Sequence, residues 1–346
     1  MNMQRLGVLT GGGDSPGINA VLRSIVRFGY RNGIETIGFL EGWRGPIDNL
    51  TRPLGVDDVS GILHIGGTLL GSSRTNPFKI DGGAEKVLKT IQQNAIDYLI
   101  AIGGDDTLGV AHQLAQKHEV KTIGIPQTID NDIAETDYSI GFASALGVIT
   151  DALDRLHTTA FSHHRVLILE VMGRDNGWLS LLGGIAGGAD VIITPEAGFQ
   201  VEEVHRKVLH RQARKKHFSL IIIAEGATPT GMDTQVVEEA EVDQFGHVRL
   251  GGVGQYLANQ LSQRLEVPVR VTNLAYLQRG GSPAPLDRIL ATRFGAAAIE
   301  FALDEKFDVM TAVHGMKIEP VKLERALSNT PRPIDSRLLY MMDLFE

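Results

Sequence analysis

The fold is decided by a stretch near the N-terminus, which reads LGVLTGGGDSPGINAVLRSIVRFGYR over residues 6–31. Its first part, residues 6–9, is a short apolar run typical of a buried β-strand. A glycine-rich turn follows at residues 10–17, and a helical pattern begins at Ile18. A strand that passes through a glycine turn into a helix is the repeating unit of α/β folds.

The same order recurs along the chain. The sequence predicts further strands at residues 34–39, 98–102, 120–125, 165–171, 191–194, 220–224, 267–274 and 307–313. It predicts further helices at residues 84–93, 107–118, 141–159, 178–187, 202–215, 254–265 and 286–303. This alternation favours an α/β fold with mainly parallel sheets. Because some ten strands are many for one sheet, we expect two Rossmann-like three-layer domains.

Composition excludes several classes of protein. The 346 residues include no cysteine, so disulfides and thiolate metal sites are ruled out. The formal charge of -8, from 33 basic and 41 acidic residues, gives no hint of nucleic acid or an anionic membrane as partner. No apolar run approaches the length of a membrane span. We therefore expect a cytoplasmic protein.

Two glycine-rich turns are candidate anion sites. Residues 11–17 follow the first strand, where backbone N–H groups and a helix N-terminus favour negative charge. The glycine spacing matches neither the dinucleotide fingerprint nor the Walker loop. The second turn, residues 103–106, adds Asp105 and Asp106, which suit Mg²⁺ when phosphate is near. The alternative is that the first turn serves packing and that the two acids cap the helix after them.

A third turn, residues 125–132, places two carboxylates after a strand. Pro126 is expected to end the pairing of that strand. If the chain stays extended, Asp130 and Asp132 share a face, because residues two apart do so in a strand. Neighbouring carboxylates usually handle a cation or a proton. The alternative is an Asp-rich turn that binds its own backbone.

Other polar residues fall at predicted strand ends or in loops. Arginines suited to bidentate phosphate binding are Arg74, Arg165, Arg174, Arg270 and Arg279. Glu225 either accepts sugar hydroxyls or caps a turn. The histidines His157, His163 and His164 lack zinc-protease spacing and are better explained by packing or solvation. Two anion turns, a magnesium carboxylate, a base and several arginines together indicate phosphoryl transfer to a hydroxyl of a phosphorylated substrate.

At this point the sequence resembles the phosphofructokinase A family. The matching motifs occur in the family's order over about residues 5–285 and are Leu9–Asn19, Gly71–Arg74, Gly103–Thr107, Pro126–Asp132, Glu170–Arg174, Ala224–Gly226 and Leu277–Gly281. The resemblance implies fructose 6-phosphate as acceptor and fructose 1,6-bisphosphate as product. It implies a donor-phosphate domain of residues 1–140 plus roughly 255–305. The sugar-phosphate domain is then 141–254 plus roughly 306–346.

The resemblance also implies catalytic roles. Asp130 matches the base for the sugar 1-hydroxyl, with Thr128 and Asp132 beside it. Arg174 matches an arginine near the acceptor and the transferred group. Asp105 matches the aspartate associated with magnesium.

Substrate contacts follow in the same way. For the sugar phosphate, the matching positions are Met172, Gly173, Glu225, Arg279 and Tyr276. Arg165 and Arg270 match arginines that reach the 6-phosphate from a neighbouring subunit, which implies a homodimer or homotetramer. For the donor, the matching contacts are Gly13 and Arg74.

Three departures bear on specificity. Asp106 stands where ATP-dependent members generally have glycine, and it resembles the pyrophosphate-dependent members. Those members usually have lysine where this chain has Gln127, a neutral donor to pyrophosphate. Tyr276 stands where many members have histidine, so sedoheptulose 7-phosphate is a second acceptor to test.

We therefore predict a reversible pyrophosphate-dependent phosphofructokinase that uses Mg²⁺. An ATP-dependent enzyme is the alternative of the same class. A non-catalytic sugar-phosphate sensor would be expected to lack Asp130, Asp105 or Arg174, and all three are present. A phosphatase would not need the second anion turn with its arginines.

Overall fold

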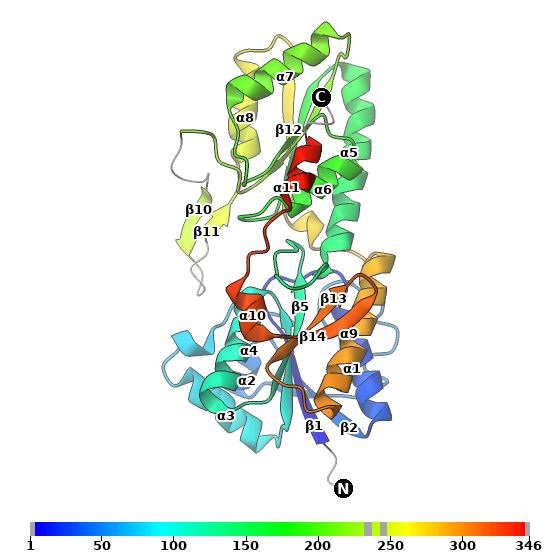
Figure 1. Ribbon diagram of the computed structural model, residues 1–346, viewed down its shortest axis with the longest axis vertical. Coiled ribbons are helices and arrows are strands. Elements are labelled where there is room, and N and C mark those ends of the chain that lie inside the picture. The colour runs from blue at the N-terminus through cyan, green and yellow to red at the C-terminus, as the bar shows by residue number, and fades with distance from the viewer. Residues whose placement is uncertain (1–3, 232–236, 243–247, 343–346) are drawn as a thin grey trace. The chain divides into compact units, whose positions relative to one another are not determined.

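The computed structural model describes residues 4–231, 237–242 and 248–342. They form two compact units (Figure 1). Within the described residues, the first unit comprises residues 4–144 and 279–332. The second comprises residues 145–231, 237–242, 248–278 and 333–342. The predicted α/β class is confirmed, because each unit contains a sheet with parallel strands.

The first unit is built on an 8-stranded sheet in the order β14-β13-β5-β4-β1-β2-β3, with β6 pairing the end of β5. The strands are β1 (Gln4–Thr10), β2 (Ile34–Phe39), β3 (Thr51–Leu54), β4 (Tyr98–Gly103), β5 (Thr122–Thr128), β6 (Ile140–Gly141), β13 (Val309–His314) and β14 (Lys317–Lys322). The edge strands β3 and β14 pair antiparallel, whereas the strands between them are parallel. Strand order reverses between β1 and β4, and α/β sheets bind ligands at the carboxyl ends of strands at such a point.

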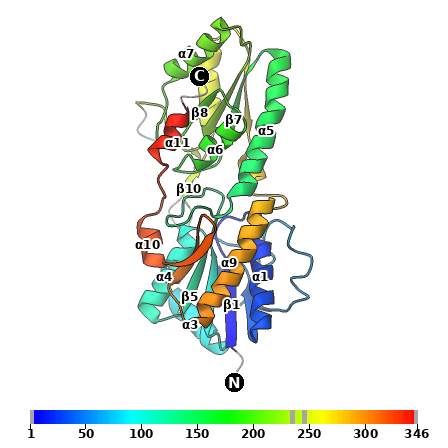
Figure 2. The ribbon, with the colours of Figure 1, turned by 45° about the vertical axis from the view of Figure 1, so that its right-hand side comes forward.

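Helices cover both faces of this sheet. One face packs against α1 (Ile18–Arg31) and α9 (Pro285–Leu303), which lie side by side in Figures 1 and 2. The other face carries α2 (Arg44–Asp48), α3 (Gly83–Gln93), α4 (Asp105–His118) and the short 3₁₀ turn η1 (Pro77–Lys79). The helix α10 (Leu323–Ser328) packs against α4. The sheet interior is mainly apolar, as expected for strands buried on both faces.

The second unit has a 4-stranded parallel sheet in the order β12-β7-β9-β8. Its strands are β12 (Val269–Asn273), β7 (Val166–Val171), β9 (Ser219–Ala224) and β8 (Val191–Ile193). Its helices are α6 (Trp178–Ala186), α7 (Val201–Ala213), α8 (Val253–Ser262), η2 (Ala275–Gln278) and α11 (Ser336–Tyr340). The long helix α5 (Phe142–His163) begins in the first unit and continues in the second. A separate antiparallel pair is formed by β10 (Val237–Val242) and β11 (Val248–Leu250).

Two segments fall in the other unit than the sequence led us to expect. Residues 255–278 were expected in the first domain, but they belong to the second unit because β12 pairs with β7. Residues 306–332 were expected in the second domain, but they belong to the first unit because β13 pairs with β5. An apolar strand suits either sheet, and its long-range pairing decides which one it joins.

Pro126 does not end its strand. It pairs with Gly103 inside β5, which continues to Thr128. The proline is tolerated because β13 pairs with β5 at Ile123 and Gly124 and not beyond, so this part of β5 is an edge on that side.

Candidate active site

The two glycine-rich turns form one site at the reversal point of the first sheet. The Gly11 backbone N–H donates to the Ile102 carbonyl at 2.9 Å. A Cβ atom at Gly103 would lie 2.7 Å from the Gly11 carbonyl oxygen, and one at Gly11 would lie 2.6 Å from Thr107 Oγ1. Glycine is therefore required at both positions, since the two backbones touch. The loop after β1 lies against the first turn of α4, which carries Asp105 and Asp106.

A second loop brings Arg74 to the same turn. Ser72 Oγ donates to the Gly12 carbonyl at 2.6 Å, and the Gly12 N–H donates to the Ser73 carbonyl at 3.2 Å. Arg74 follows these residues and is exposed. This predicted donor arginine is thus anchored beside the glycine turn.

Arg279 lies on the other flank of the glycine turn. Its guanidinium occupies the space that a Cβ atom at Gly13 would need. Its Nη1 donates to the Asp14 carbonyl at 3.3 Å. The arginine matched to the sugar 6-phosphate therefore lies, in this structure, on the loop matched to the donor.

Gln127 holds the glycine turn after β1 through two hydrogen bonds. The side chain is 2% exposed, and its Nε2 donates to the Gly13 carbonyl at 3.1 Å and to Ser15 Oγ at 2.9 Å. The amide nitrogen that we expected to bind pyrophosphate is thus used by the chain itself. Ser15, which the sequence did not single out, in turn donates to the Ile140 carbonyl at 3.2 Å. It therefore connects Gln127 to β6.

Asp130 is oriented by its neighbour Thr128. The Asp130 N–H donates to Thr128 Oγ1 at 3.2 Å, and that hydroxyl lies 3.5 Å from Asp130 Oδ2, to which it donates. The expected extended segment is wrong, because Asn131 has a φ of 54° and turns the chain. Asp130 and Asp132 therefore do not share the face of a strand. The carboxylate of Asp130 is instead fixed by a local turn.

The second unit gathers the predicted sugar residues at the carboxyl ends of β7 and β9. The Arg174 N–H donates to Glu225 Oε1 at 3.3 Å, and the Glu225 N–H donates to the Val171 carbonyl at 2.8 Å. The Met172 N–H donates to Gln278 Oε1 at 3.3 Å.

Backbone conformation marks the same turn. Gly173 has a φ of 140° and Arg174 one of 51°. A left-handed arginine is uncommon and points to a constrained turn. Tyr276 is also at this edge, in η2 after β12, and is 62% exposed.

Arg165 and Arg270 lie at the opposite end of that sheet, where its parallel strands begin. Arg165 immediately precedes β7, and Arg270 pairs with Leu167 near the start of β7. The 6 residues of β7 span about 20 Å at the usual rise per residue of a strand. In a single chain these two arginines are therefore a strand length away from Arg174 and Glu225.

Comparison with known proteins identifies the family. Residues 5–302 match the protein family described as Phosphofructokinase. The chain belongs to the phosphofructokinase family. It is 50% identical over 323 residues to a pyrophosphate–fructose 6-phosphate 1-phosphotransferase of Amycolatopsis methanolica, an alignment that covers 93% of this chain and 94% of the relative. It is 44% identical over 334 residues to ATP-dependent 6-phosphofructokinase 3 of Streptomyces coelicolor, with 96% and 97% covered.

A solved structure shows the same fold. A phosphofructokinase from Saccharomyces cerevisiae matches with a TM-score of 0.82 and 29% identity, over 99% of this chain and 47% of the yeast chain. The chain thus spans about half the length of the yeast chain.

Two buried acids support this phosphofructokinase site without having been predicted. Asp287, in the first turn of α9, accepts hydrogen bonds from the Gly141 N–H at 3.0 Å and the Ser144 N–H at 2.7 Å. Burial raises the pKa of its carboxyl. Glu170 accepts from the N–H groups of Gly252 at 2.8 Å and Gly254 at 2.9 Å. The sequence shows that Asp287 is an acid in the first turn of a predicted helix, but it does not show the distant backbone groups that Asp287 binds.

The candidate metal donors are carboxylates beside the glycine turn. In the described ranges, no three His, Cys, Asp or Glu side chains are grouped so that they could hold a metal ion by themselves. His157 instead packs edge-on to Phe218 with ring centroids 5.0 Å apart, as the packing interpretation predicted. Asp105 and Asp106 carry hard oxygen donors and lie against the candidate anion turn, a donor set that fits Mg²⁺ when phosphate oxygens and water complete it.

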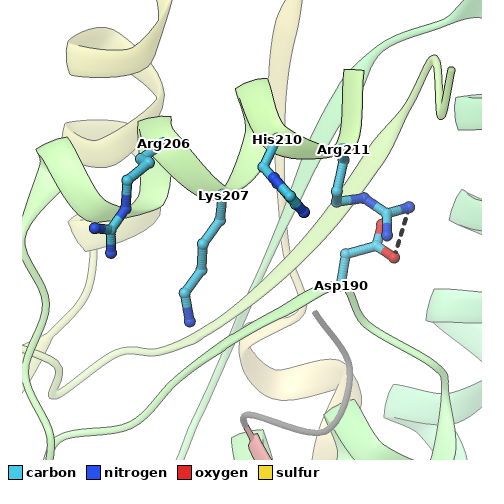
Figure 3. A pocket seen from close by; sticks show the side chains of 5 residues that line it. All are labelled: Asp190, Arg206, Lys207, His210 and Arg211. Atoms are coloured by element: carbon cyan, nitrogen blue, oxygen red, sulfur yellow. Dashed lines mark ion pairs between the residues drawn. The ribbon is translucent and has the colours of Figure 1, made fainter. Parts of the chain in front are cut away.

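The second unit of this phosphofructokinase also contains a basic pocket of about 210 Å³ (Figure 3). Its lining residues are Asp190, Arg206, Lys207, His210 and Arg211. Arg211 pairs with Asp190 at 2.8 Å, and burial raises the pKa of Asp190 although Arg211 lowers it. None of the predicted site residues lines this pocket. As for membranes, no helix in the described part of the chain is long and apolar enough to span one.

Proposed function

We propose that the protein transfers a phosphoryl group from pyrophosphate to the 1-hydroxyl of fructose 6-phosphate. The product is fructose 1,6-bisphosphate, and the reaction is reversible and belongs to glycolysis and gluconeogenesis. The relative that is 50% identical carries this activity in its name, and four relatives named as ATP-dependent are less similar, at 42–44%. A cytoplasmic location stays a prediction.

Asp106 is the observation that carries the choice of donor. Its carboxylate stands in the first turn of α4, next to the Gly11 turn and beside Asp105. A nucleotide would place its α-phosphate and ribose against this turn, where a carboxylate repels the one and takes the space of the other. Pyrophosphate has neither group. The side chain therefore selects against ATP more than against pyrophosphate.

The donor is held by backbone and by arginine. The glycine turn leads into the start of α1, where the helix dipole favours an anion. Arg74 flanks the turn and adds a bidentate donor for phosphate oxygens. Gln127 keeps the turn in place through Gly13 and Ser15. Asp105, with Asp106 next to it, would hold Mg²⁺, which offsets charge on the transferred group.

Asp130 acts as the base. Thr128 Oγ1 accepts from the Asp130 N–H and donates to its carboxylate, and this orients the carboxylate that takes the proton of the sugar hydroxyl. Arg174 offsets negative charge on the transferred phosphoryl group. Most of the catalysis is positioning and charge neutralisation, as in other phosphoryl transfers.

The acceptor is bound by Met172, Gly173, Arg174 and Glu225, and Tyr276 and Arg279 are the proposed ligands of its 6-phosphate in the same chain. Arg165 and Arg270 complete the 6-phosphate site from a second copy of the chain, because their own sheet separates them from Arg174. The protein is therefore a homo-oligomer, and the 6-phosphate site of a single chain is incomplete without these two arginines of another copy.

The test is an assay of fructose 1,6-bisphosphate formation with Mg²⁺ and either pyrophosphate or ATP. We expect kcat/KM with pyrophosphate to exceed that with ATP by about 100-fold or more, since one unfavourable carboxylate contact is worth a few kcal/mol. Reactions without fructose 6-phosphate control for hydrolysis of the donor. Activity mainly with ATP would establish the alternative, an ATP-dependent phosphofructokinase, which the neutral Gln127 leaves open.

A further inference from the structure

A segment near the C-terminus lies against the loop that carries the proposed base. The Arg332 backbone N–H donates to the Asp132 carbonyl at 2.6 Å. The Arg332 guanidinium donates through Nη1 to the carbonyl oxygens of Thr136 and, at 2.9 Å, Asp137. One residue far away in sequence thus binds three backbone carbonyls of a single loop.

Neighbours of Arg332 add further contacts to the same loop. Thr330 Oγ1 accepts from the Ala134 N–H at 3.0 Å and donates to the Ala326 carbonyl at 2.8 Å, which ties the loop to α10. Asn329 Nδ2 donates to Glu135 Oε1 at 3.1 Å. The segment 329–332 therefore follows the loop residue by residue.

The contacts of Arg332 lead directly to Asn131, which lies between Asp130 and Asp132. Asn131 is 2% exposed, and its Nδ2 donates to the Asp137 carbonyl at 3.3 Å, the oxygen that Arg332 also binds. Its Oδ1 accepts from the Ser139 N–H at 2.9 Å. Because Asn131 holds the left-handed turn of the loop, a shift of Asp137 would move the Asp130 carboxylate.

Burying the Arg332 guanidinium against this loop is unfavourable in free energy. Burial lowers the pKa of its guanidinium, while the negative charges of Asp137 and Asp132 raise it. A guanidinium still stays protonated at neutral pH. Taking it out of water costs free energy that its hydrogen bonds to carbonyl oxygens must offset. A neutral or shorter side chain could fill the space but could not bridge two carbonyls in this way.

We propose that Arg332 is a positioning residue that fixes the loop 129–139 and thereby holds Asp130 beside Thr128. This inference rests on the proposed role of Asp130 as base. Arg332 touches no reacting atom. Its loss misplaces the carboxylate, and misplacement by about 1 Å can cost about 100-fold in rate.

The experiment compares Arg332→Met and Arg332→Lys with Arg325→Met. Arg325 lies in the same C-terminal region and pairs with Glu135 of the same loop at 2.8 Å, but its side chain is 69% exposed. We expect kcat to fall by about 10- to 100-fold in Arg332→Met, with KM for pyrophosphate within about threefold. Arg332→Lys, which keeps the charge and N–H donors but on a shorter side chain, should fall between this variant and the wild type. Arg325→Met should keep near-normal kcat, because exposed ion pairs contribute little.

Hydrogen exchange of peptides covering residues 129–139 gives a second measurement. Arg332→Met should exchange faster there than the wild type and Arg325→Met, while its thermal midpoint identifies any global unfolding. If Arg332→Met does not fold, Arg332→Lys decides alone. Unchanged kcat and unchanged exchange would overturn the proposal, as would a loss expressed in KM instead of kcat. Asp130→Ala, measured alongside, should lose turnover and keep loop protection. An active Asp130→Ala would refute the base assignment, and the exchange data would still decide the role of Arg332.

Discussion

Asp130 owes its orientation to two neighbours within one turn. Thr128 contacts it from the end of β5, and Asn131 fixes the reversal of the chain after it. The sequence identified Asp130 and Thr128 by residue type and by their place after a strand. It could not show that the loop turns at Asn131, because asparagine is only one of several residues that tolerate a left-handed conformation.

Asp130→Asn tests the base directly. The amide has nearly the same shape, and its oxygen can still accept from Thr128 Oγ1, but it cannot take a proton. We expect kcat to fall by about 1,000-fold, within the usual range for losing a general base, with KM values for both substrates changed by less than about threefold. Steady-state kinetics with pyrophosphate measures both quantities. Turnover within tenfold of the wild type would remove Asp130 from this role.

Asp106→Gly tests donor choice at a single side chain. Removing the carboxylate next to the glycine turn opens room for an α-phosphate and ribose and removes the repulsion. The ratio of kcat/KM for ATP to that for pyrophosphate should rise by about tenfold or more, as expected when one repulsive contact is lost. Asp105→Gly is the matched control in the same turn, and it should lose activity with both donors because it removes the magnesium carboxylate. An unchanged ratio in Asp106→Gly would mean that donor choice is set elsewhere.

At the level of elements, buried apolar runs were the most reliable signal. The strand predicted at residues 34–39 and the helix that begins at Ile18 agree with β2 and α1. Antiparallel edge strands were missed: β3 is only 4 residues long, and β14 has no buried residue and contains Pro320. Such strands carry little hydrophobic pattern, because part of their surface faces water.

Contacts between distant elements explain what the sequence could not supply at the site. Gln127 was expected to bind the donor, yet its amide nitrogen binds Gly13 and Ser15. Likewise, Arg332 was not considered, because its partners are about two hundred positions earlier in the chain. Residue type and strand ends locate a site, whereas the partners of each side chain depend on tertiary packing.

Asp287→Asn tests how one element holds another. Asp287 in α9 accepts hydrogen bonds from Gly141 and Ser144 at the start of α5 with both carboxylate oxygens. Asparagine has only one such oxygen, so the variant should unfold with about 1–3 kcal/mol less free energy. Chemical denaturation monitored by circular dichroism gives this value.

The cost of Asp287→Asn should also depend on pH. Burial raises the pKa of Asp287 in the folded chain above its unfolded value of about 3.9. The folded state therefore binds this proton more tightly, which contributes stability below about pH 4 that is lost as pH rises through the folded pKa. The wild type has this contribution and the variant does not. The difference in unfolding free energy should thus shrink between pH 4 and pH 7, and a gap that widened would show that the pKa is lowered.

At the scale of the whole molecule, the predicted residues of the second sheet fall into two groups, one at the carboxyl ends of its parallel strands and one at their amino ends. Glu225 and Arg174 follow strands, whereas Arg165 precedes one and Arg270 is near the start of another. The chain order alone contains this division, since all strands of the second sheet are parallel. Which strands share that sheet was not available from the sequence, and residues 255–278 were assigned to the other domain for that reason.

Subunit complementation tests whether Arg165, at the amino ends of the strands of the second sheet, completes a site in another copy of the chain. Arg165→Ala and Asp130→Ala should each be nearly inactive as homo-oligomers, the first through a higher KM for fructose 6-phosphate and the second through kcat. In a mixed dimer, the site with its own Asp130 and the partner's Arg165 is intact, and the other site lacks both. Random mixing makes half of the dimers mixed, so co-refolded protein should regain about a quarter of wild-type activity. Refolding each variant alone is the control. If the mixture stays inactive while size-exclusion chromatography shows mixed oligomers, Arg165 serves its own chain or none.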